Sequence, residues 1–240
     1  MRLTQGLKSA GQAVVDLILP QECLGCGRSG TWLCRGCLGS IRLRHDFACA
    51  ACHRPSWQGE THEACGKTTA LDGQIIAAWR GPLLKDLIHS LKYENLTEAA
   101  GPLAGLLRRK TDGTPLFNAL LLGESTALVP VPLHQRKEWD RGYNQSRLLA
   151  KELAQDMGIE ILDQAIKRTR NTKTQTELPR HKRLTNLKNA FEATEPEIIK
   201  GRNLVIVDDV LTTGATAGEL AKVLKQAGAK EVWALALMRG

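Results

Sequence analysis

The chain reads Leu204-Val205-Ile206-Val207-Asp208-Asp209-Val210-Leu211-Thr212-Thr213-Gly214-Ala215-Thr216 near its carboxyl end. The first four residues form a continuous aliphatic run, which is typical of a strand buried on both faces of a parallel sheet. Two carboxylates follow where such a strand would reach its carboxyl edge. Small and hydroxyl-bearing residues then lead into an amphipathic helix. The stretch therefore predicts a strand, a turn and a helix of an α/β fold.

A turn of this kind can hold a phosphate, because backbone N–H groups converge at a helix N-terminus and the helix dipole favours an anion by about 0.3–1 kcal/mol. Carboxylates accept hydrogen bonds from a vicinal diol or bind Mg²⁺ through water. Diol, metal and phosphate together describe a ribose phosphate. Two alternatives are a buried strand with an Asx-type turn and a capped helix, and a response-regulator acid pocket. The second leaves the glycine-threonine helix start unexplained.

These thirteen residues resemble the phosphoribosyl pyrophosphate signature of type I phosphoribosyltransferases. In that family two acids face the ribose hydroxyls and a threonine-rich loop holds the 5′-phosphate. The resemblance implies that Asp208 and Asp209 contact the diol and the shell of a bound Mg²⁺, and that they are the catalytic pair if the protein is an enzyme. It implies a ligand-binding segment made of Asp208, Asp209, Val210, Leu211, Thr212, Thr213, Gly214, Ala215 and Thr216.

The cysteines divide the chain into two parts, since all seven lie in the first 65 of 240 residues. Three Cys-x2-Cys pairs each offer two thiolates to a tetrahedral ion, a spacing typical of zinc sites. His62-x2-Cys65 has the same spacing with an imidazole in place of one thiolate. We predict a four-cysteine site and a Cys3His site, made respectively of Cys23, Cys26, Cys34 and Cys37, and of Cys49, Cys52, His62 and Cys65.

Both sites are complete with four protein ligands, which favours structural over catalytic zinc because no position is left for water. Disulfides are the alternative, but they require an oxidising compartment, and an odd number of cysteines pairs poorly. Few large apolar residues lie between positions 20 and 72, whereas a structural zinc contributes about 10–16 kcal/mol in finger peptides. We therefore expect residues 20–72 to form a double zinc ribbon that holds two structural zinc ions.

Residues 1–19 are predicted to form an N-terminal helix that docks on the body of the protein. Its apolar patch at 14–19 is too short to span a bilayer, and Lys8, Gln12 and Asp16 interrupt the residues before it. No other segment has the apolar length of a membrane span. We therefore expect a soluble, cytoplasmic protein.

Residues 73–240 alternate between predicted strands and helices. The strands are expected at 74–79, 127–131, 159–161, 203–207 and 231–237, and the helices at 82–91, 96–109, 117–122, 144–157 and 216–227, with a loop at 111–115. This order predicts a parallel sheet with helices on both faces and ligands at the carboxyl ends of its strands. The predicted fold class is α/β, a type I phosphoribosyltransferase-like sheet preceded by a double zinc ribbon, with a basic insertion at 163–200.

A second candidate ligand loop follows the strand at 127–131. It contains Arg136 and Arg141, and Asn144 stands before the next helix. If this loop lies at the same sheet edge as Asp208, its arginines can bind a pyrophosphate, and Asn144 caps the helix. The alternative is a solvated basic loop with an ordinary helix cap.

Most of the formal net charge of +8 comes from one segment, residues 167–188, in which Glu177 is the only acid. Such a local charge points to a polyanionic partner more than to general solubility. A solvated charged insertion is the alternative, and no stacking platform is evident because Phe191 is the nearest aromatic residue. The candidate nucleic-acid residues are Lys167, Arg168, Arg170, Lys173, Arg180, Lys182, Arg183 and Lys188.

The whole pattern resembles the ComF family, which includes ComFC and GntX-like proteins, over nearly the full chain from Leu19. The shared features are the zinc pairs, the terminal signature, Leu91-Lys92-Tyr93, Pro130-Val131-Pro132-Leu133, Arg141-Gly142-Tyr143-Asn144-Gln145, Thr174-Gln175 and Asn186-Leu187-Lys188-Asn189-Ala190-Phe191. His62 stands where that family usually has cysteine. The resemblance implies handling of incoming single-stranded DNA in natural competence, with competence helicases or other DNA-processing proteins as partners.

The sequence leaves two functions open. In a binding protein, the pocket holds phosphoribosyl pyrophosphate or a related ribose phosphate with Mg²⁺, while the basic segment and the zinc ribbon hold single-stranded DNA. In an active phosphoribosyltransferase, a nucleophile attacks the anomeric carbon as pyrophosphate leaves. No residue in the sequence can be named as reading a base or activating an acceptor, which favours the binding protein and leaves the acceptor unidentified.

Overall fold

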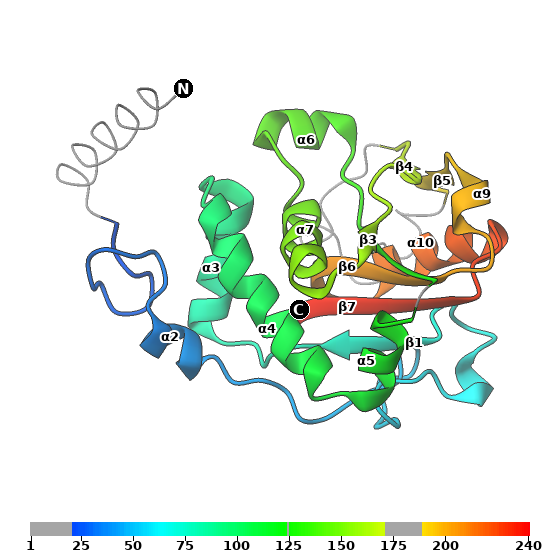
Figure 1. Ribbon diagram of the computed structural model, residues 1–240, viewed down its shortest axis with the longest axis horizontal. Coiled ribbons are helices and arrows are strands. Elements are labelled where there is room, and N and C mark those ends of the chain that lie inside the picture. Colours follow the sequence, from blue (N-terminus) through cyan, green and yellow to red (C-terminus); the bar gives the residue numbers. More distant parts are fainter. Residues whose placement is uncertain (1–20, 124, 171–188) are drawn as a thin grey trace.

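A five-stranded sheet forms the centre of the protein in the computed structural model, which describes residues 21–123, 125–170 and 189–240 (Figure 1). Its strand order is β1-β7-β6-β2-β3, and every neighbouring pair is parallel. The predicted α/β fold is therefore confirmed. The strands are β1 (Gly73–Ile76), β2 (Thr126–Pro130), β3 (Glu160–Ile161), β6 (Asn203–Leu211) and β7 (Glu231–Arg239).

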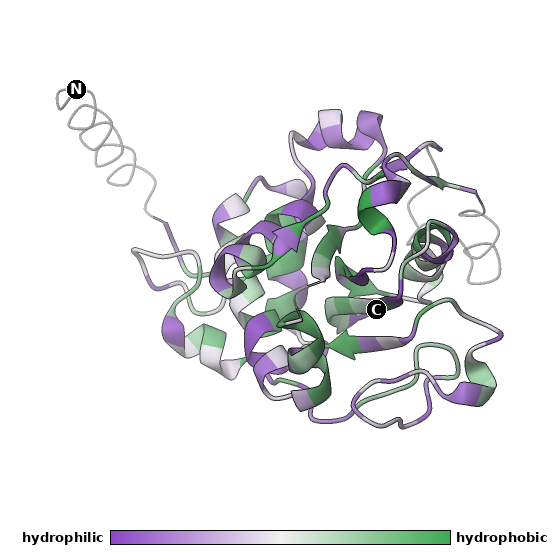
Figure 2. Ribbon diagram, turned by 45° about the vertical axis from the view of Figure 1, so that its right-hand side comes forward, coloured by the Kyte–Doolittle hydropathy of each residue, from purple (hydrophilic) through white to green (hydrophobic). Residues whose placement is uncertain are grey.

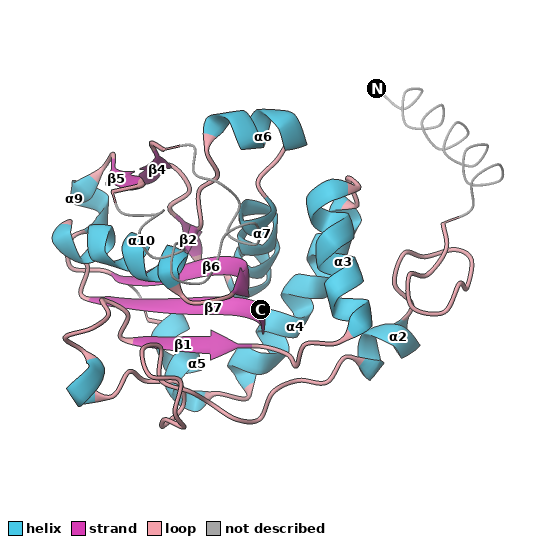
Figure 3. Ribbon diagram, turned by 180° about the vertical axis from the view of Figure 1, so that it is seen from behind, coloured by secondary structure: helices cyan, strands magenta, loops and turns pink. Residues whose placement is uncertain are grey.

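Helices cover both faces of this sheet, as Figure 3 shows from behind. Leu204 and Ile206 of β6 pack in the core on the side of α10, whereas Val205 and Val207 pack in the core on the side of the other large helices. All four side chains are fully buried, and each such burial contributes about 1.5–3 kcal/mol. These helices are α3 (Pro82–Tyr93), α4 (Ala100–Asp112), α5 (Pro115–Leu121), α7 (Gln145–Met157) and, on the opposite face, α10 (Ala215–Gln226).

Several short elements surround the sheet. They are α2 (Arg35–Ser40), η1 (Glu63–Cys65), η2 (Thr97–Ala99), α6 (Gln135–Arg141) and α9 (Pro196–Ile199), together with an antiparallel pair of strands, β4 (Ile166–Arg168) and β5 (Phe191–Ala193). Hydrophilic residues colour α6 in Figure 2, whereas the strands at the centre are hydrophobic. Within the three described ranges, no helix combines the length and the apolar character that a membrane crossing requires.

Three elements differ most from their predicted boundaries. The strand expected at 74–79 ends at Ile76, although Ala77 and Ala78 still donate backbone hydrogen bonds to Ala236 and Leu237 of β7. The helix expected at 96–109 begins as a 3-10 turn and continues to Asp112, so part of the loop expected at 111–115 is helical. The strand expected at 203–207 continues to Leu211, because it keeps pairing with the equally long β7.

The loop expected after β2 contains a helix, α6, that the sequence did not predict. His134 caps its start, since its Nδ1 accepts a hydrogen bond from the backbone N–H of Arg136 at 3.2 Å. Gly142 ends it with a φ of 83°, a left-handed conformation that glycine adopts without strain. Asn144 caps the next helix as predicted.

The cysteine-rich region packs directly against the body of the protein. Ile41 lies in the core, and residues 43 and 78 form an antiparallel bridge. Gln74 Nε2 donates hydrogen bonds to the carbonyl oxygens of Ala48 and Cys49, at 3.0 and 3.1 Å. The boundary at 72/73 stays a prediction, while these contacts tie the two parts together. The N-terminal helix predicted at 1–19 lies outside the described residues.

Candidate functional site

Asp208 and Asp209 lie in β6 and are almost fully buried, with 9% and 2% of their surface exposed. Asp208 Oδ1 accepts hydrogen bonds from the Ser146 hydroxyl at 3.0 Å and from the backbone N–H of Asp209 at 2.9 Å. Asp209 Oδ1 accepts a hydrogen bond from Gln145 Nε2 at 3.0 Å. The first turn of α7 therefore supplies side-chain donors to both carboxylates.

Burial raises the pKa of Asp208 to about 7, and the neighbouring charge of Asp209 adds to this effect. Lys92 and the Ser146 hydroxyl act in the opposite direction, because they stabilise the ionised carboxylate. The charge of Asp209 thus lies close enough to Asp208, in surroundings shielded from solvent, to oppose the ionisation of Asp208.

Lys92, in the last turn of α3, forms an ion pair with Asp209 Oδ2. Its side chain is 22% exposed and that of Asp209 is 3% exposed. Burial lowers the pKa of Lys92, but the two carboxylates outweigh this effect and the net direction is upward. In the part of the chain that the structure describes, Lys92 is the only polar partner of Asp209 Oδ2.

A cavity of about 690 Å³ opens next to these residues. Lys92 and Gln145, which both contact Asp209, line it, whereas the two carboxylates are not among its lining residues. A ligand in the cavity therefore meets Lys92 and Gln145 before it meets the acids in this conformation. The lining residues are Lys92, Tyr93, Glu94, Asn95, Leu133, Lys137, Asp140, Arg141, Tyr143, Gln145, Arg168 and Thr216.

The turn between β6 and α10 lies at the carboxyl edge of the sheet, as the sequence predicts. Gly214 precedes α10 with a φ of 76°, in the left-handed region. Thr213 Oγ1 accepts a hydrogen bond from the backbone N–H of Ala215 at 3.3 Å, and Thr216 lines the cavity. Amide groups in the first turn of a helix lack partners within the helix, so this end of α10 suits an anion. Val210 and Leu211, placed in the ligand segment from the sequence, belong to β6.

The structure places the three residues of the predicted pyrophosphate loop in different surroundings. Arg141 lines the cavity, donates a hydrogen bond to Gln145 Oε1 and lies with its guanidinium carbon 5.3 Å from the ring centroid of Tyr93. Arg136 is exposed and lines a different hollow beside Trp139. Asn144 is only 1% exposed, and all its side-chain hydrogen bonds go to backbone groups.

Only the first three candidate nucleic-acid residues fall within the described ranges. Lys167 pairs with Glu192 at 3.3 Å across the β4–β5 hairpin. Arg168 lines the cavity, and burial lowers its pKa while the charge of Asp208 opposes this shift. Arg170 is exposed. The remaining five, Lys173, Arg180, Lys182, Arg183 and Lys188, lie outside the described residues.

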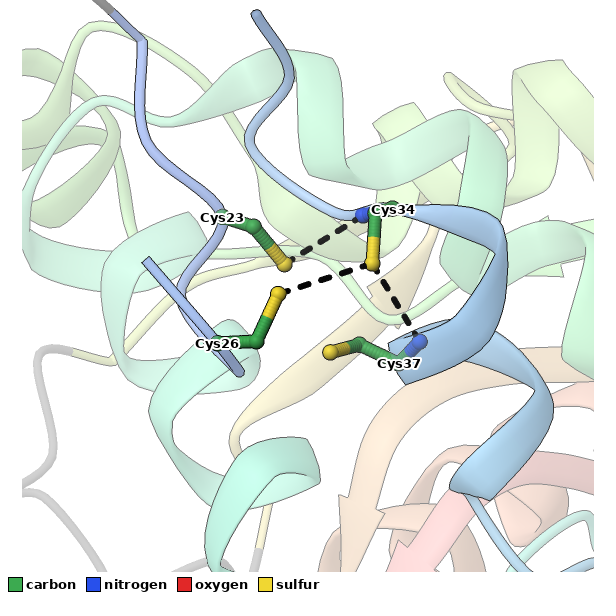
Figure 4. A group of neighbouring side chains, drawn as sticks. All are labelled: Cys23, Cys26, Cys34 and Cys37. Atoms are coloured by element: carbon green, nitrogen blue, oxygen red, sulfur yellow. Dashed lines mark hydrogen bonds between the residues drawn. The ribbon is translucent and has the colours of Figure 1, made fainter. Parts of the chain in front are cut away.

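The four cysteines of the first predicted metal site come together with their sulfur atoms facing one another (Figure 4). All four sulfur atoms lie within 4.8 Å of one another. The backbone N–H of Cys34 donates to Cys23 Sγ at 3.3 Å, and that of Cys37 donates to Cys34 Sγ at 3.4 Å, where α2 begins. This donor set and spacing suit a tetrahedral zinc ion.

Cys49, Cys52, His62 and Cys65 form the second cluster, with ligand atoms also within 4.8 Å of one another. His62 Nδ1 lies 3.4 Å from Cys52 Sγ, while its Nε2 lies 3.0 Å from the carbonyl oxygen of Pro55. A hydrogen bond from Nε2–H to that carbonyl leaves the Nδ1 lone pair for a metal, the arrangement common around zinc-bound histidines. The substitution of His62 for the usual cysteine is therefore compatible with the site.

The thiols within each cluster have opposite pKa shifts. A hydrogen bond from the Cys34 N–H contributes most to lowering the pKa of Cys23 to about 6, whereas the neighbouring sulfurs raise the pKa of Cys37 to about 12. Burial opposes ionisation of Cys49, but N–H groups of Cys52 and His62 lower its pKa to about 7. Burial and the neighbouring sulfurs of Cys52 and Cys49 raise the pKa of Cys65 to about 11. Thiolates packed this closely repel one another, and a bound cation in place of their protons would offset that repulsion.

Sequence reasoning assigned no role to Lys92, Gln145 or Ser146, although the first two lie in the motifs quoted above. They reach the acid pair only because the end of α3 and the start of α7 both meet β6. Nothing local in the sequence signals this meeting, since the contacts span 62 residues or more.

Comparison with known proteins agrees with both halves of this architecture. Residues 144–240 match the family described as phosphoribosyl transferase domain, and residues 14–68 match the double zinc ribbon domain. DNA utilization protein YhgH of Escherichia coli (strain K12) is 36% identical over 228 residues, which cover 85% of this chain and 95% of that protein.

Two further relatives carry competence in their names. Competence protein F of Haemophilus influenzae is 31% identical over 224 residues, covering 85% of this chain and 96% of that protein. Competence protein ComFC of Bacillus subtilis (strain 168) is 25% identical over 206 residues, covering 82% of this chain and 79% of that protein. With a double zinc ribbon ahead of a phosphoribosyltransferase-type domain, and relatives matched over most of their length, the chain belongs to the ComF family.

Proposed function

We propose that the protein binds the phosphate of phosphoribosyl pyrophosphate or ribose 5-phosphate at the turn between β6 and α10. The observation that carries this proposal is that the N-terminus of α10, which follows Gly214, adjoins the cavity, since Thr216 in the first turn of α10 lines it. Lys92, Lys137, Arg141 and Arg168 line the cavity against Glu94 and Asp140, so its charge favours an anion. The sequence match to a phosphoribosyl transferase domain over residues 144–240 supports the same ligand class.

Calorimetry with ribose 5-phosphate and phosphoribosyl pyrophosphate tests this proposal. Thr216→Val should weaken binding about tenfold or more, because a hydrogen bond to a charged group contributes about 1.5–3 kcal/mol. Thr97→Val, at the start of η2, is the matched control and should bind as the wild type does. Asp208→Asn and Asp209→Asn should also weaken binding. Equal affinity in the wild type and all three site variants would remove the assignment.

We propose further that the protein handles single-stranded DNA during DNA uptake, with the basic segment 167–188 as its contact. The names of the relatives, DNA utilization protein and competence protein, and the local positive charge support this. Neutralising Lys182 and Arg183 should reduce the slope of log K against log salt by about 0.7 per lost contact. Neutralising the exposed Lys85 and Lys151 is the control. An unchanged slope in the first variant would tell against this segment.

The seven cysteines form no disulfide among the described residues, and their two clusters fit a pair of structural zinc centres. Each cluster supplies four protein ligands and leaves no position for water, so we propose a structural role for both ions. A pentosyl transfer reaction is the alternative use of the pocket. Release of pyrophosphate from phosphoribosyl pyrophosphate with any nucleobase would establish it.

A further inference from the structure

The predicted Mg²⁺ does not fit the acid pair as the structure has it. Mg²⁺ requires octahedral oxygen ligands at about 2.0–2.1 Å and usually keeps several of its waters. Asp208 and Asp209 are 9% and 2% exposed and do not line the cavity, so little of either carboxylate is open to the waters that Mg²⁺ would keep. Protein donors already occupy Oδ1 of each residue. The remaining close contact of the pair, at Asp209 Oδ2, is with the ammonium of Lys92.

Lys92 is held in place by the fold around it. The preceding residue, Leu91, is fully buried in the core of the protein. The Tyr143 hydroxyl, on the segment that leads into α7, donates a hydrogen bond to the Leu91 carbonyl oxygen at 2.5 Å. The end of α3 is thereby fixed to the segment that also supplies Gln145 and Ser146 to the acids. The ammonium of Lys92 thus reaches the acid pair from an anchored stretch of backbone.

We propose that Lys92 is the resident cation of the acid pair, that it keeps divalent metal from Asp208 and Asp209, and that the sugar phosphate binds without Mg²⁺. The last part rests on the proposed function, whereas the first two do not. The ammonium supplies the positive charge that a metal would bring, and it also lines the cavity, where it can meet an anionic ligand. A divalent ion would have to displace it from a buried contact.

Direct metal binding tests the proposal without any sugar ligand. Zinc-loaded full-length protein is titrated with Mn²⁺, and bound ion is measured from the loss of the free-ion electron paramagnetic resonance signal. Lys92→Met should bind Mn²⁺ about tenfold or more tightly than the wild type, and adding Asp209→Asn should abolish the gain. Lys85→Met, an exposed lysine of the same helix, is the control and should gain nothing.

Two further variants keep the test decisive if Lys92→Met folds poorly. Lys92→Gln is neutral but can still donate a hydrogen bond to Asp209, so it should also gain an Mn²⁺ site. Lys92→Arg keeps the charge and should not. The proposal is overturned if the wild type binds Mn²⁺ as tightly as the neutral variants, or if the arginine variant gains the site.

Calorimetry with ribose 5-phosphate, in buffer freed of divalent ions by resin and without chelators that would remove zinc, tests the second part. Wild-type affinity should agree within about twofold with and without Mg²⁺, whereas Lys92→Met should need Mg²⁺ to bind. Wild-type binding that requires Mg²⁺ overturns the inference. Absence of any sugar phosphate binding, together with the expected Mn²⁺ results, supports the resident cation and counts against the proposed function alone.

Discussion

Replacing Asn144 with alanine should destabilise the protein, because this residue joins two loops at the carboxyl edge of the sheet. Its side-chain oxygen accepts hydrogen bonds from the backbone N–H groups of Ser146 and Arg147, at 3.0 and 3.4 Å. Its amide nitrogen donates to the Val131 carbonyl oxygen at 3.0 Å. Asn144 is 1% exposed and Val131 is 4% exposed, so water does not easily replace these partners.

The expected loss follows from these contacts. Removing a helix cap costs about 1 kcal/mol, within a range of about 0.5–2 kcal/mol. Leaving the buried carbonyl of Val131 without its donor costs about 1–3 kcal/mol. Together they predict a loss of about 2–4 kcal/mol in the free energy of unfolding. For a chain of this size each kcal/mol lowers the melting temperature by about 2–4 °C, which gives a decrease of about 4–16 °C.

Thermal unfolding of zinc-loaded wild type and variant, at the same scan rate and free zinc concentration, measures this loss, because unfolding releases metal. Asn144→Ser keeps a capping hydroxyl but is too short to reach Val131, so its melting temperature should fall between the two. Below the transition, Asn144→Ala should bind ribose 5-phosphate within about threefold of the wild type. Unchanged stability of Asn144→Ala would refute the reasoning. Loss of ribose 5-phosphate binding by the folded variant, below its transition, would also refute it.

Three other changes test separate parts of the structure. Burial lowers the pKa of Lys110 to about 8, below its value of 10.5 in the unfolded chain. Because the folded state therefore binds fewer protons than the unfolded state between these pH values, the stability of the wild type relative to Lys110→Met should increase as the pH rises from 7 to 9.5. A difference in melting temperature that stays constant over this range would contradict this. Gly73→Ala would bring a Cβ to 2.2 Å from the Trp233 ring and should cost about 1–3 kcal/mol by denaturation, whereas Gly105→Ala, with open space around it, should not destabilise. His62→Ala should lower the zinc content measured by mass spectrometry from two ions to one, and His62→Cys should restore it; two ions in the alanine variant would exclude His62 as a ligand.

The sequence predicts those parts of the fold that local pattern determines. The aliphatic run at 204–207 indicates a strand buried on both faces, and its neighbouring residues do alternate between the two cores. The zinc ligands are found because the two members of each pair stand three positions apart in the sequence. The cap at Asn144 is likewise local, since its partners on α7 are two and three residues away.

The surroundings of the acid pair could not be predicted, because they depend on contacts between distant segments. The sequence predicts that Asp208 and Asp209 lie just after a strand that ends at residue 207. In the structure, β6 continues past them, because Val210 and Leu211 pair with Met238 and Arg239. α7 then supplies donors from 62 and 64 residues away. A residue pattern records that a carboxylate follows a strand, but not which helix end covers it.

The cations around the cavity bear on the choice between binding and catalysis. Pentosyl transfer requires groups that stabilise the departing pyrophosphate more strongly in the transition state than in the ground state. Arg141 is already held by Gln145 and packed against Tyr93, and Lys92 is already paired with Asp209. Cations held in this way attract the phosphates of a bound ligand, and they raise the rate only where this attraction is stronger in the transition state than in the ground state. Under the proposed function, turnover would therefore require a cation that meets the departing pyrophosphate more closely than it meets the bound ligand, and pyrophosphate release is the measurement that decides between binding and catalysis.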